Sequence, residues 1–280
     1  MSGLERIPLS LQRHAANPRG VGRAAEVWRL FQEAAVQASI RAGWPPERYI
    51  AAGTSFVVYS MSVRHHREIA YGEALTAETW VSSFKRATLT QREVRLLTED
   101  GRIADATQRW VHVGPTLKPT RASPELLNAL TLLDRGEPEV ALPEHEALEG
   151  TERRFVFEVW HTWMDPLAHV NHPAYVDFCD EAISRVLVEA GLEPTRMVPV
   201  AEEVDWKRGA VAGARLAVLT RPAGRTADGD AVLTHQILDA DDASQVYATA
   251  TTVRRLLDAD GAPILAAFGY SGVAQSSQKS

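Results

Sequence analysis

The chain has 280 residues, of which 45% are hydrophobic and 24% are charged. This length allows two modest domains or one large one, and the composition is ordinary for a soluble globular protein. The net charge of −6 gives no electrostatic basis for binding nucleic acid. One cysteine, Cys179, excludes an internal disulfide framework and fits a reducing compartment.

We expect no signal peptide at the N-terminus. The first residues show no basic segment leading into an apolar run, and no stretch approaches the roughly 20 apolar residues of a membrane-spanning helix. Residues 271–280 are polar and without pattern, so we expect a flexible tail there. We therefore expect a cytoplasmic protein without a membrane span.

The first predicted element is a long helix. Apolar residues recur at helical spacing from Val27 to Ala42, and Gly43 marks the end. Strand-like runs follow at residues 56–63, 77–83, 89–97 and 104–113, with Glu99-Asp100-Gly101 as a hairpin turn between the last two. Residues 135–149, rich in Glu, Pro and Gly, then predict a linker.

The second half of the chain repeats this order. We predict a helix after His172, with Pro173 at its first position and Gly191 as its C-terminal cap. Its apolar stripe runs from Tyr175 to Ala190. Strand-like runs follow at residues 198–206, 215–220, 232–238 and 246–257.

The two halves align as an internal repeat. Placing Ala42-Gly43 on Ala190-Gly191 gives an offset of 148 residues, and residues 17–48 then show seven identities without a gap. A long apolar helix is buried only if the antiparallel sheet that follows wraps around it. We therefore predict an α+β fold, a tandem (double) hotdog, in which each unit is a long central helix wrapped by an antiparallel β-sheet. The units are expected at residues 1–135 and 150–270.

Chemistry-bearing residues gather between 161 and 175, just before the second helix. The segment holds one carboxylate, Asp165, with an amide and three imidazoles (Asn171, His161, His169 and His172). Such residues are often helix caps or turn formers. However, a helix N-terminus also presents free N–H groups and a partial positive charge of roughly +0.5, which suits an oxyanion. Asp165 is close enough along the loop to face a carbonyl carbon bound there.

The string Asp165-Pro-Leu-Ala-His169-Val-Asn171, followed by Tyr175, resembles a motif of the 4-hydroxybenzoyl-CoA and acyl-carrier-protein (acyl-ACP) thioesterase branch of the hotdog superfamily. The resemblance implies hydrolysis of acyl-CoA or acyl-ACP thioesters, with Asp165 as nucleophile or general base. It also implies that the backbone N–H of His172 polarises the thioester carbonyl, that His169 matches the histidine of the plant acyl-ACP thioesterases, and that Asn171 and Tyr175 lie in the substrate site.

Two positions depart from the plant pattern. Leu167 stands where the plant enzymes carry a catalytic Asn, and Gly209 stands where they carry a Glu. The mechanism that fits this sequence therefore centres on Asp165. In the first half, Asn17 replaces Asp165, and an amide is a poor base. We predict one working site for each chain, in the second half.

Equivalent strand ends in the two halves carry charged residues. We expect Arg67, Lys207 and Arg208 either to be solvated or to bind the phosphates of CoA or phosphopantetheine. Glu68 lies at the position that matches Gly209, and could supply a second carboxylate. Pairing of two chains into a homodimer is left open.

No metal or cofactor is predicted. His161, Asp165 and His169 would face one ion only on a continuous helix, and Pro166 interrupts it. Alternatives to hydrolysis are a non-catalytic acyl-CoA-binding hotdog protein, and an acyltransferase or cyclase of a biosynthetic pathway. The carboxylate Asp165 argues against a pure binding protein.

Overall fold

The two apolar stripes form the two long helices of the structure, which is a computed structural model that describes residues 3–134 and 139–270. They are α1 (Ala24–Arg41) and α4 (Ala174–Glu189). Each ends in the same glycine motif: Gly43 and Gly191 have φ values of +82° and +74°. The next residue then donates a backbone hydrogen bond into the last helical turn. The predicted helices are confirmed, although α4 begins at Ala174, with Pro173 as the residue just before it.

The strands of both halves join in one antiparallel sheet. In the N-terminal half they are β1 (Leu4–Ser10), β2 (Ser55–His65), β3 (Ala74–Lys85), β4 (Leu89–Thr98) and β5 (Gly101–Val113). In the C-terminal half they are β6 (His145–Ala147), β7 (Arg153–Glu158), β8 (Met197–Trp206), β9 (Arg215–Thr226), β10 (Ala231–Asp239) and β11 (Val246–Leu256). Within the described residues the order is β1-β3-β4-β5-β2-β8-β11-β10-β9-β6, with β7 also paired to β9.

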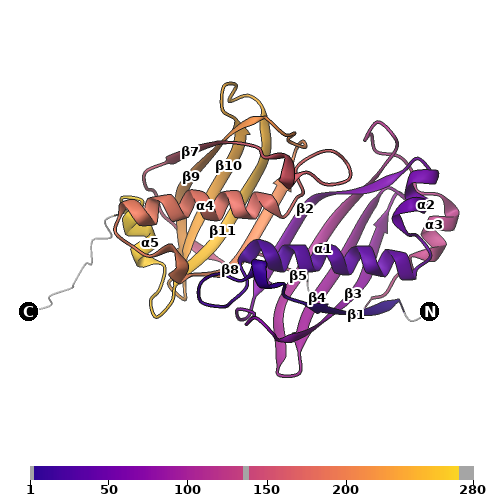
Figure 1. Cartoon of the computed structure of the whole chain (residues 1–280), viewed down its shortest axis with the longest axis horizontal. Helices are drawn as coiled ribbons and strands as arrows, with labels where there is room; N and C mark the ends of the chain where they lie inside the picture. Colours follow the sequence, from indigo (N-terminus) through magenta and orange to yellow (C-terminus); the bar gives the residue numbers. More distant parts are fainter. Residues whose placement is uncertain (1–2, 135–138, 271–280) are drawn as a thin grey trace, which may run out of the picture.

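Short helices complete the chain: α2 (Pro46–Ala51), α3 (Pro124–Ala129) and α5 (Ala262–Ala267), with 3-10 turns η1 (Arg13–Ala15), η2 (His161–Trp163) and η3 (Pro194–Arg196). Both long helices lie on one face of the sheet (Figure 1). The main hydrophobic cluster between helices and sheet runs through both halves, and smaller clusters lie beside it. This is a hotdog-type fold, and all eight predicted strands are present, β9 being longer than predicted.

The repeat in the sequence is also a repeat in strand irregularities. The β2–β5 ladder skips Tyr59, and the β8–β11 ladder skips Val200, 141 residues later. The β3–β4 ladder skips Ser82, and the β9–β10 ladder skips Ala223, again 141 residues later. A β-bulge bends its strand at a defined place, so bulges at matched positions show that the two halves curve around their helices in the same way.

Strands β2 and β8 form the junction between the halves. Their antiparallel register runs from Ser60 opposite Asp205 to Arg64 opposite Ala201. On the helix side of this junction, the carboxylate of Glu202 in β8 is fully buried. It accepts hydrogen bonds from Trp28 in α1 (3.1 Å), His65 in β2 (2.7 Å) and Arg254 in β11. Burial alone would raise its pKa, but His65 and Arg254 outweigh burial and lower the pKa of Glu202 to about 2.

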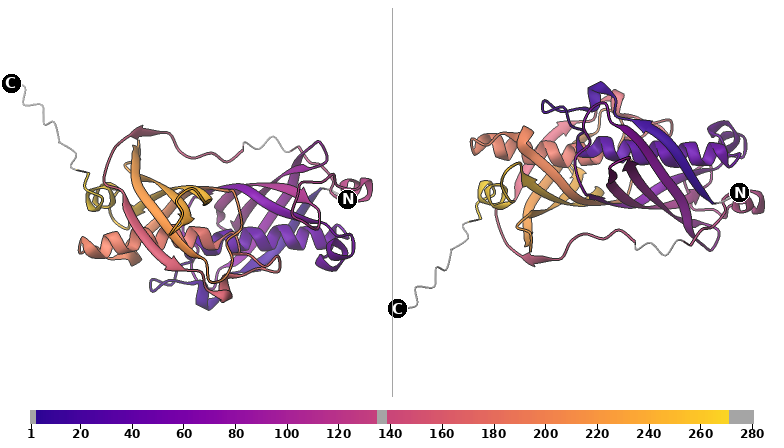
Figure 2. Two further views of the ribbon diagram at one scale, coloured as in Figure 1. Left: turned by 90° about the horizontal axis from the view of Figure 1, so that it is seen from above. Right: turned by 90° about the horizontal axis from the view of Figure 1, so that it is seen from below.

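The connection between the halves differs from a loose linker over its described part. Figure 2 shows it crossing the sheet face opposite the two helices. Glu139 forms an ion pair with Arg109, and the N–H of Val140 donates to Thr107 Oγ1 at 2.9 Å. Residues 145–147 then pair with β9. Residues 135–138 of the predicted linker, and the tail predicted at 271–280, lie outside the described residues.

Candidate active site

A tight turn holds Asp165 at the entrance to α4. The N–H of Asp165 donates to the carbonyl of His169 at 2.8 Å, and its carboxylate Oδ1 accepts the N–H of Leu167 at 2.8 Å. Ala168 completes the turn with a φ of +61°, a left-handed conformation that is strained for a residue with a Cβ. The turn fixes the direction of the carboxylate before any substrate is bound.

Asp165 and His169 lie next to each other in this loop. Their Oδ1 and Nδ1 atoms lie 3.4 Å apart, and the side chains are 12% and 18% exposed. The Nδ1 of His169 has no hydrogen-bond partner among the described residues. The pair is therefore close enough to interact electrostatically, and both groups retain the capacity to bond to a substrate or a water molecule.

Gly209 makes room for the imidazole of His169. A Cβ added at residue 209 would lie 2.8 Å from Cβ and 2.9 Å from Cγ of His169, closer than real Cβ contacts. The glycine at the position where the plant motif carries Glu is therefore explained by packing: any larger residue would displace His169.

His172 lies deeper, at the N-terminus of α4. Burial above all, helped by His169 and Arg29, lowers the pKa of its imidazole to about 3, so the ring is neutral at physiological pH. Its ring packs edge-on against Trp110 of β5 and Trp206 of β8, with centroid distances of 6.0 and 5.4 Å. His172 thus lies where the two halves meet.

Tyr175 anchors the helix to the loop that carries Gly209. Its hydroxyl accepts the backbone N–H of Ala210 at 3.3 Å, and burial raises the pKa of Tyr175 to about 12. Val170, in the Asp165 loop, donates its N–H to the carbonyl of Ala210 at 2.8 Å. Two hydrogen bonds to Ala210 therefore hold the two loops together.

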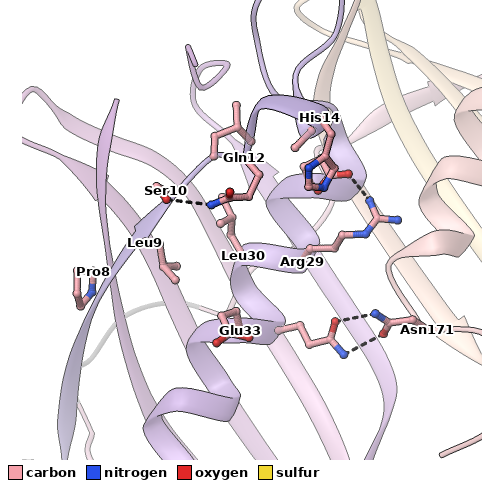
Figure 3. A pocket seen from close by; sticks show the side chains of 13 residues that line it. Pro8, Leu9, Ser10, Gln12, His14, Arg29, Leu30, Glu33 and Asn171 are labelled. Atoms are coloured by element: carbon pink, nitrogen blue, oxygen red, sulfur yellow. Dashed lines mark hydrogen bonds and ion pairs between the residues drawn. The ribbon is translucent and has the colours of Figure 1, made fainter. Parts of the chain in front are cut away.

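Asn171 connects the site to the N-terminal half. Its side-chain amide exchanges two hydrogen bonds with Gln32 of α1. A neighbouring groove of about 640 Å³ runs between β1 and α1 and reaches Asn171 (Figure 3). Gln32, Trp110 and Trp206 were not found from the sequence, because only the pairing of the two halves brings them to residues 165–175.

The predicted charged substrate-binding residues either bond to residues outside the Asp165 loop or are exposed to solvent. Arg67 binds Glu73 and Thr98 within the N-terminal half. Glu68 forms a two-fold ion pair with Arg19. The hydrogen bonds and ion pairs described for Arg67 and Glu68 do not reach Asp165. Lys207 and Arg208 directly precede Gly209; Arg208 bonds to Gln245 at 2.7 Å, and Lys207 is exposed.

The first half of the chain forms the same turn, with Asn17 at the place of Asp165. The N–H of Asn17 donates to the carbonyl of Val21 at 2.8 Å, and its side-chain oxygen accepts the N–H of Arg19 at 2.9 Å. These bonds match those of Asp165, 148 residues later. Here Gly20, with a φ of +76°, takes the place of Ala168. The backbone of the turn is repeated, whereas only the second turn carries a carboxylate and an imidazole.

Two properties of the described residues bear on cofactors and membranes. Across residues 3–134 and 139–270, no group of three or more His, Cys, Asp and Glu side chains could hold a metal ion. No helix in this part of the chain is long and apolar enough to cross a membrane.

Comparison with known families supports a thioesterase. Residues 19–130 match the acyl-ACP thioesterase N-terminal domain, and residues 159–268 match the thioesterase-like superfamily. The fold and these matches define the chain as a thioester hydrolase. More narrowly, its C-terminal part is similar to the thioesterase-like superfamily, and its N-terminal part is similar to the N-terminal domain of acyl-ACP thioesterases. Comparison with curated protein sequences gave no match.

Solved structures share the fold over most of their length. A proposed oleoyl thioesterase from Lactobacillus plantarum is 18% identical, with a TM-score of 0.75 over 91% of this chain and 97% of that chain. An acyl-ACP thioesterase from Bacteroides thetaiotaomicron is 12% identical, with a TM-score of 0.71 over 90% and 98%. The 12:0-ACP thioesterase from Umbellularia californica is 15% identical, with a TM-score of 0.70 over 90% and 94%.

Proposed function

We propose that the chain hydrolyses acyl-CoA or acyl-ACP thioesters at a single site centred on Asp165. The observation that carries the proposal is the carboxylate–imidazole pair of Asp165 and His169, fixed 3.4 Å apart beside the N-terminus of a long helix. A carboxylate positioned in this way can attack a thioester carbon or remove a proton from an attacking water molecule. The family match to acyl-ACP thioesterases supports the carrier-linked substrate.

The oxyanion would be stabilised at the start of α4. The backbone N–H of His172 has no acceptor among the described residues, and it precedes the first helical turn. A free N–H at the positive end of a helix is suited to the negative charge that develops on the thioester oxygen. His172 therefore contributes through its backbone, while its neutral side chain packs between the two indoles.

The reaction balances with water as the only co-reactant. In the general-base route, the water oxygen bonds to the carbonyl carbon and its proton passes to Asp165. The C–S bond then breaks, and the proton moves to the departing thiolate. In the nucleophilic route, Asp165 forms a mixed anhydride that water hydrolyses. A single turnover in ¹⁸O-labelled water distinguishes the routes, because only the nucleophilic one can leave ¹⁸O in Asp165.

The proposed architecture is a double hotdog, with units at residues 1–135 and 150–270. The matched turns of Asn17 and Asp165, the matched bulges, and the shared sheet support this division. The N-terminal unit would contribute to substrate binding through α1, whose Gln32 contacts Asn171. The single free cysteine, Cys179, is buried, which is compatible with the proposed cytoplasmic location.

The test is thioester hydrolysis by the Asp165→Asn variant, with released thiol as the readout. We expect a loss of at least about 10³-fold in kcat, since the amide neither attacks nor accepts a proton. Asp205→Asn, on β8, is the matched control and should retain activity. Full activity of Asp165→Asn would refute the assignment.

A further inference from the structure

Three buried ring nitrogens beside the catalytic loop have no hydrogen-bond partner among the described residues. They are Nε2 of His172, Nε1 of Trp110 and Nε1 of Trp206. The residues belong to three separate segments, yet the ring of His172 lies 6.0 Å from that of Trp110 and 5.4 Å from that of Trp206. Unpaired buried polar atoms are uncommon, and three in one cluster call for an explanation.

This cluster, His172, Trp110 and Trp206, adjoins the reacting groups. Tyr175 lies against Trp206, with ring centroids 6.3 Å apart, and bonds to Ala210. Ala210 follows Gly209, the residue on which the imidazole of His169 rests. Both indole rings are only partly buried, although their nitrogen atoms are buried. The cluster is therefore linked to the loop of Asp165 and His169 through Tyr175 and Ala210.

The chemistry of these nitrogens limits what can satisfy them. An indole N–H is a donor only, so the two tryptophans require an acceptor. The neutral imidazole of His172 offers one donor and one acceptor. A saturated alkyl chain has no acceptor, and packing one here would leave both indole N–H groups unpaired.

The positions related to these by the internal repeat show how the chain satisfies such groups internally. His65 corresponds to Trp206 and Arg254 to Trp110, and both bond to the buried carboxylate of Glu202. The residue that corresponds to Glu202, 141 positions earlier, is Met61, which is buried and has no oxygen. Beside Met61, the Nε2 of Gln108 lies 3.8 Å from the methionine sulfur, and the Oε1 of Gln108 is itself buried without a partner among the described residues. The carboxylate that satisfies His65 and Arg254 is thus missing at the matched position.

We propose that this cluster binds an oxygen atom on the acyl chain, so that the preferred substrates are hydroxyacyl or oxoacyl thioesters rather than plain saturated ones. This inference rests on the proposed thioesterase function and narrows its substrate class. The hydroxyl or oxo oxygen accepts from the indole N–H groups, and a hydroxyl can also donate to the imidazole of His172.

The experiment compares acyl-CoAs of one chain length that differ only in the oxygen. Saturated octanoyl-CoA is measured beside octanoyl-CoAs carrying a hydroxyl or oxo group at C2, C3, C4 or C5. We expect kcat/KM to be about 10- to 100-fold higher for at least one oxygenated substrate than for octanoyl-CoA. Equal or higher values for octanoyl-CoA against the whole panel would overturn the inference.

Replacing the indoles tests the named donors. In Trp110→Phe and Trp206→Phe, each N–H is lost and an aromatic ring remains. The ratio of kcat/KM for the oxygenated substrate to kcat/KM for octanoyl-CoA should therefore fall toward one. Trp44→Phe is the matched control, because Nε1 of Trp44 is also buried and unpaired but belongs to a separate cluster. A uniform loss of kcat with every substrate would instead assign the N–H groups to the thioester carbonyl and refute the proposal.

A binding measurement tests this inference independently of the proposed hydrolysis. If no thioester is hydrolysed, the thioesterase proposal fails, but affinity for non-hydrolysable thioether analogues can still be measured by calorimetry. Tighter binding of an oxygenated analogue than of the saturated one, lost in Trp206→Phe, would support the polar cluster independently. Equal affinities would refute it.

Discussion

The side-chain amides of Gln32 and Asn171 exchange two hydrogen bonds, 2.9 and 3.1 Å long, between α1 of one half and the Asp165 loop of the other. Each amide donates once and accepts once. The contact joins the half that carries Asp165 to the half that lacks an equivalent carboxylate, at the residue that precedes His172.

This amide pair should position the loop for catalysis. We expect Gln32→Leu and Asn171→Leu each to lower kcat/KM by about 10-fold, because a displaced loop loses the orientation of Asp165. The double variant should be little worse than either single one, since both remove the same interaction. Steady-state kinetics on the four proteins measures the coupling. Strictly additive losses would show that the two residues act separately.

Ala168 should be a site where glycine is stabilising. With a φ of +61°, its Cβ is strained, whereas Gly20 occupies the equivalent turn of the first half. We expect Ala168→Gly to raise the free energy of unfolding by about 0.5–1 kcal/mol, as relief of strain exceeds the added flexibility of the unfolded chain. Urea unfolding provides the measurement. Ala212→Gly, where φ is not positive, is the control and should be destabilising.

The buried carboxylate of Glu202 should be a major source of stability. Glu202→Met places the residue of the equivalent position, Met61, in the C-terminal half. It leaves His65, Trp28 and one side of Arg254 without their acceptor. We expect a loss of about 3–5 kcal/mol in the free energy of unfolding. Glu203→Gln, on the opposite face of β8, is the control and should change it by less than about 1 kcal/mol. Similar effects of the two variants would contradict the stabilising role given to Glu202 and its hydrogen bonds.

His235 should make stability dependent on pH. Its ring bonds to Thr220 and Thr252, each at 2.9 Å, and burial lowers its pKa from 6.5 to about 3. Between these values the unfolded chain binds a proton that the folded chain does not, so stability falls as the pH falls from about 6.5 toward 3. In His235→Gln, the slope of unfolding free energy against pH should decrease by about 1.4 kcal/mol per pH unit in that window.

Urea unfolding at pH 7, 6, 5 and 4 measures this slope. The exposed His145 offers a control, His145→Gln, in which the slope should match that of the wild type. An unchanged slope in His235→Gln would show that the buried ring is protonated with little cost to the fold.

The helices and strands could be predicted, and the loop at Asp165 could be singled out, because their signals are local. Apolar spacing defines α1 and α4, and the string from Asp165 to Asn171 lies within one turn. The partners across the junction could not be predicted in this way. Trp110 reaches His172 only because β2 pairs with β8 in one register, which no short stretch of sequence encodes.

Two further features depend on three-dimensional proximity. A glycine is needed at residue 209 because the imidazole of His169 packs against it. The carboxylate of Glu68 pairs with the guanidinium of Arg19, 49 residues away. The segment at 139–149 has a linker-like composition, yet its ion pair with Arg109 and its pairing with β9 fix it to the sheet.

The shared β2–β8 ladder also bears on how the two halves could diverge. In a pair of identical chains, a substitution near the two-fold axis is imposed on both sides at once. In this chain, Glu202 and Met61 occupy matched places in the fold but are encoded separately. One of the two matched places can therefore hold an ionic cluster around Glu202 that stabilises the junction, while the other, around Met61, carries no carboxylate.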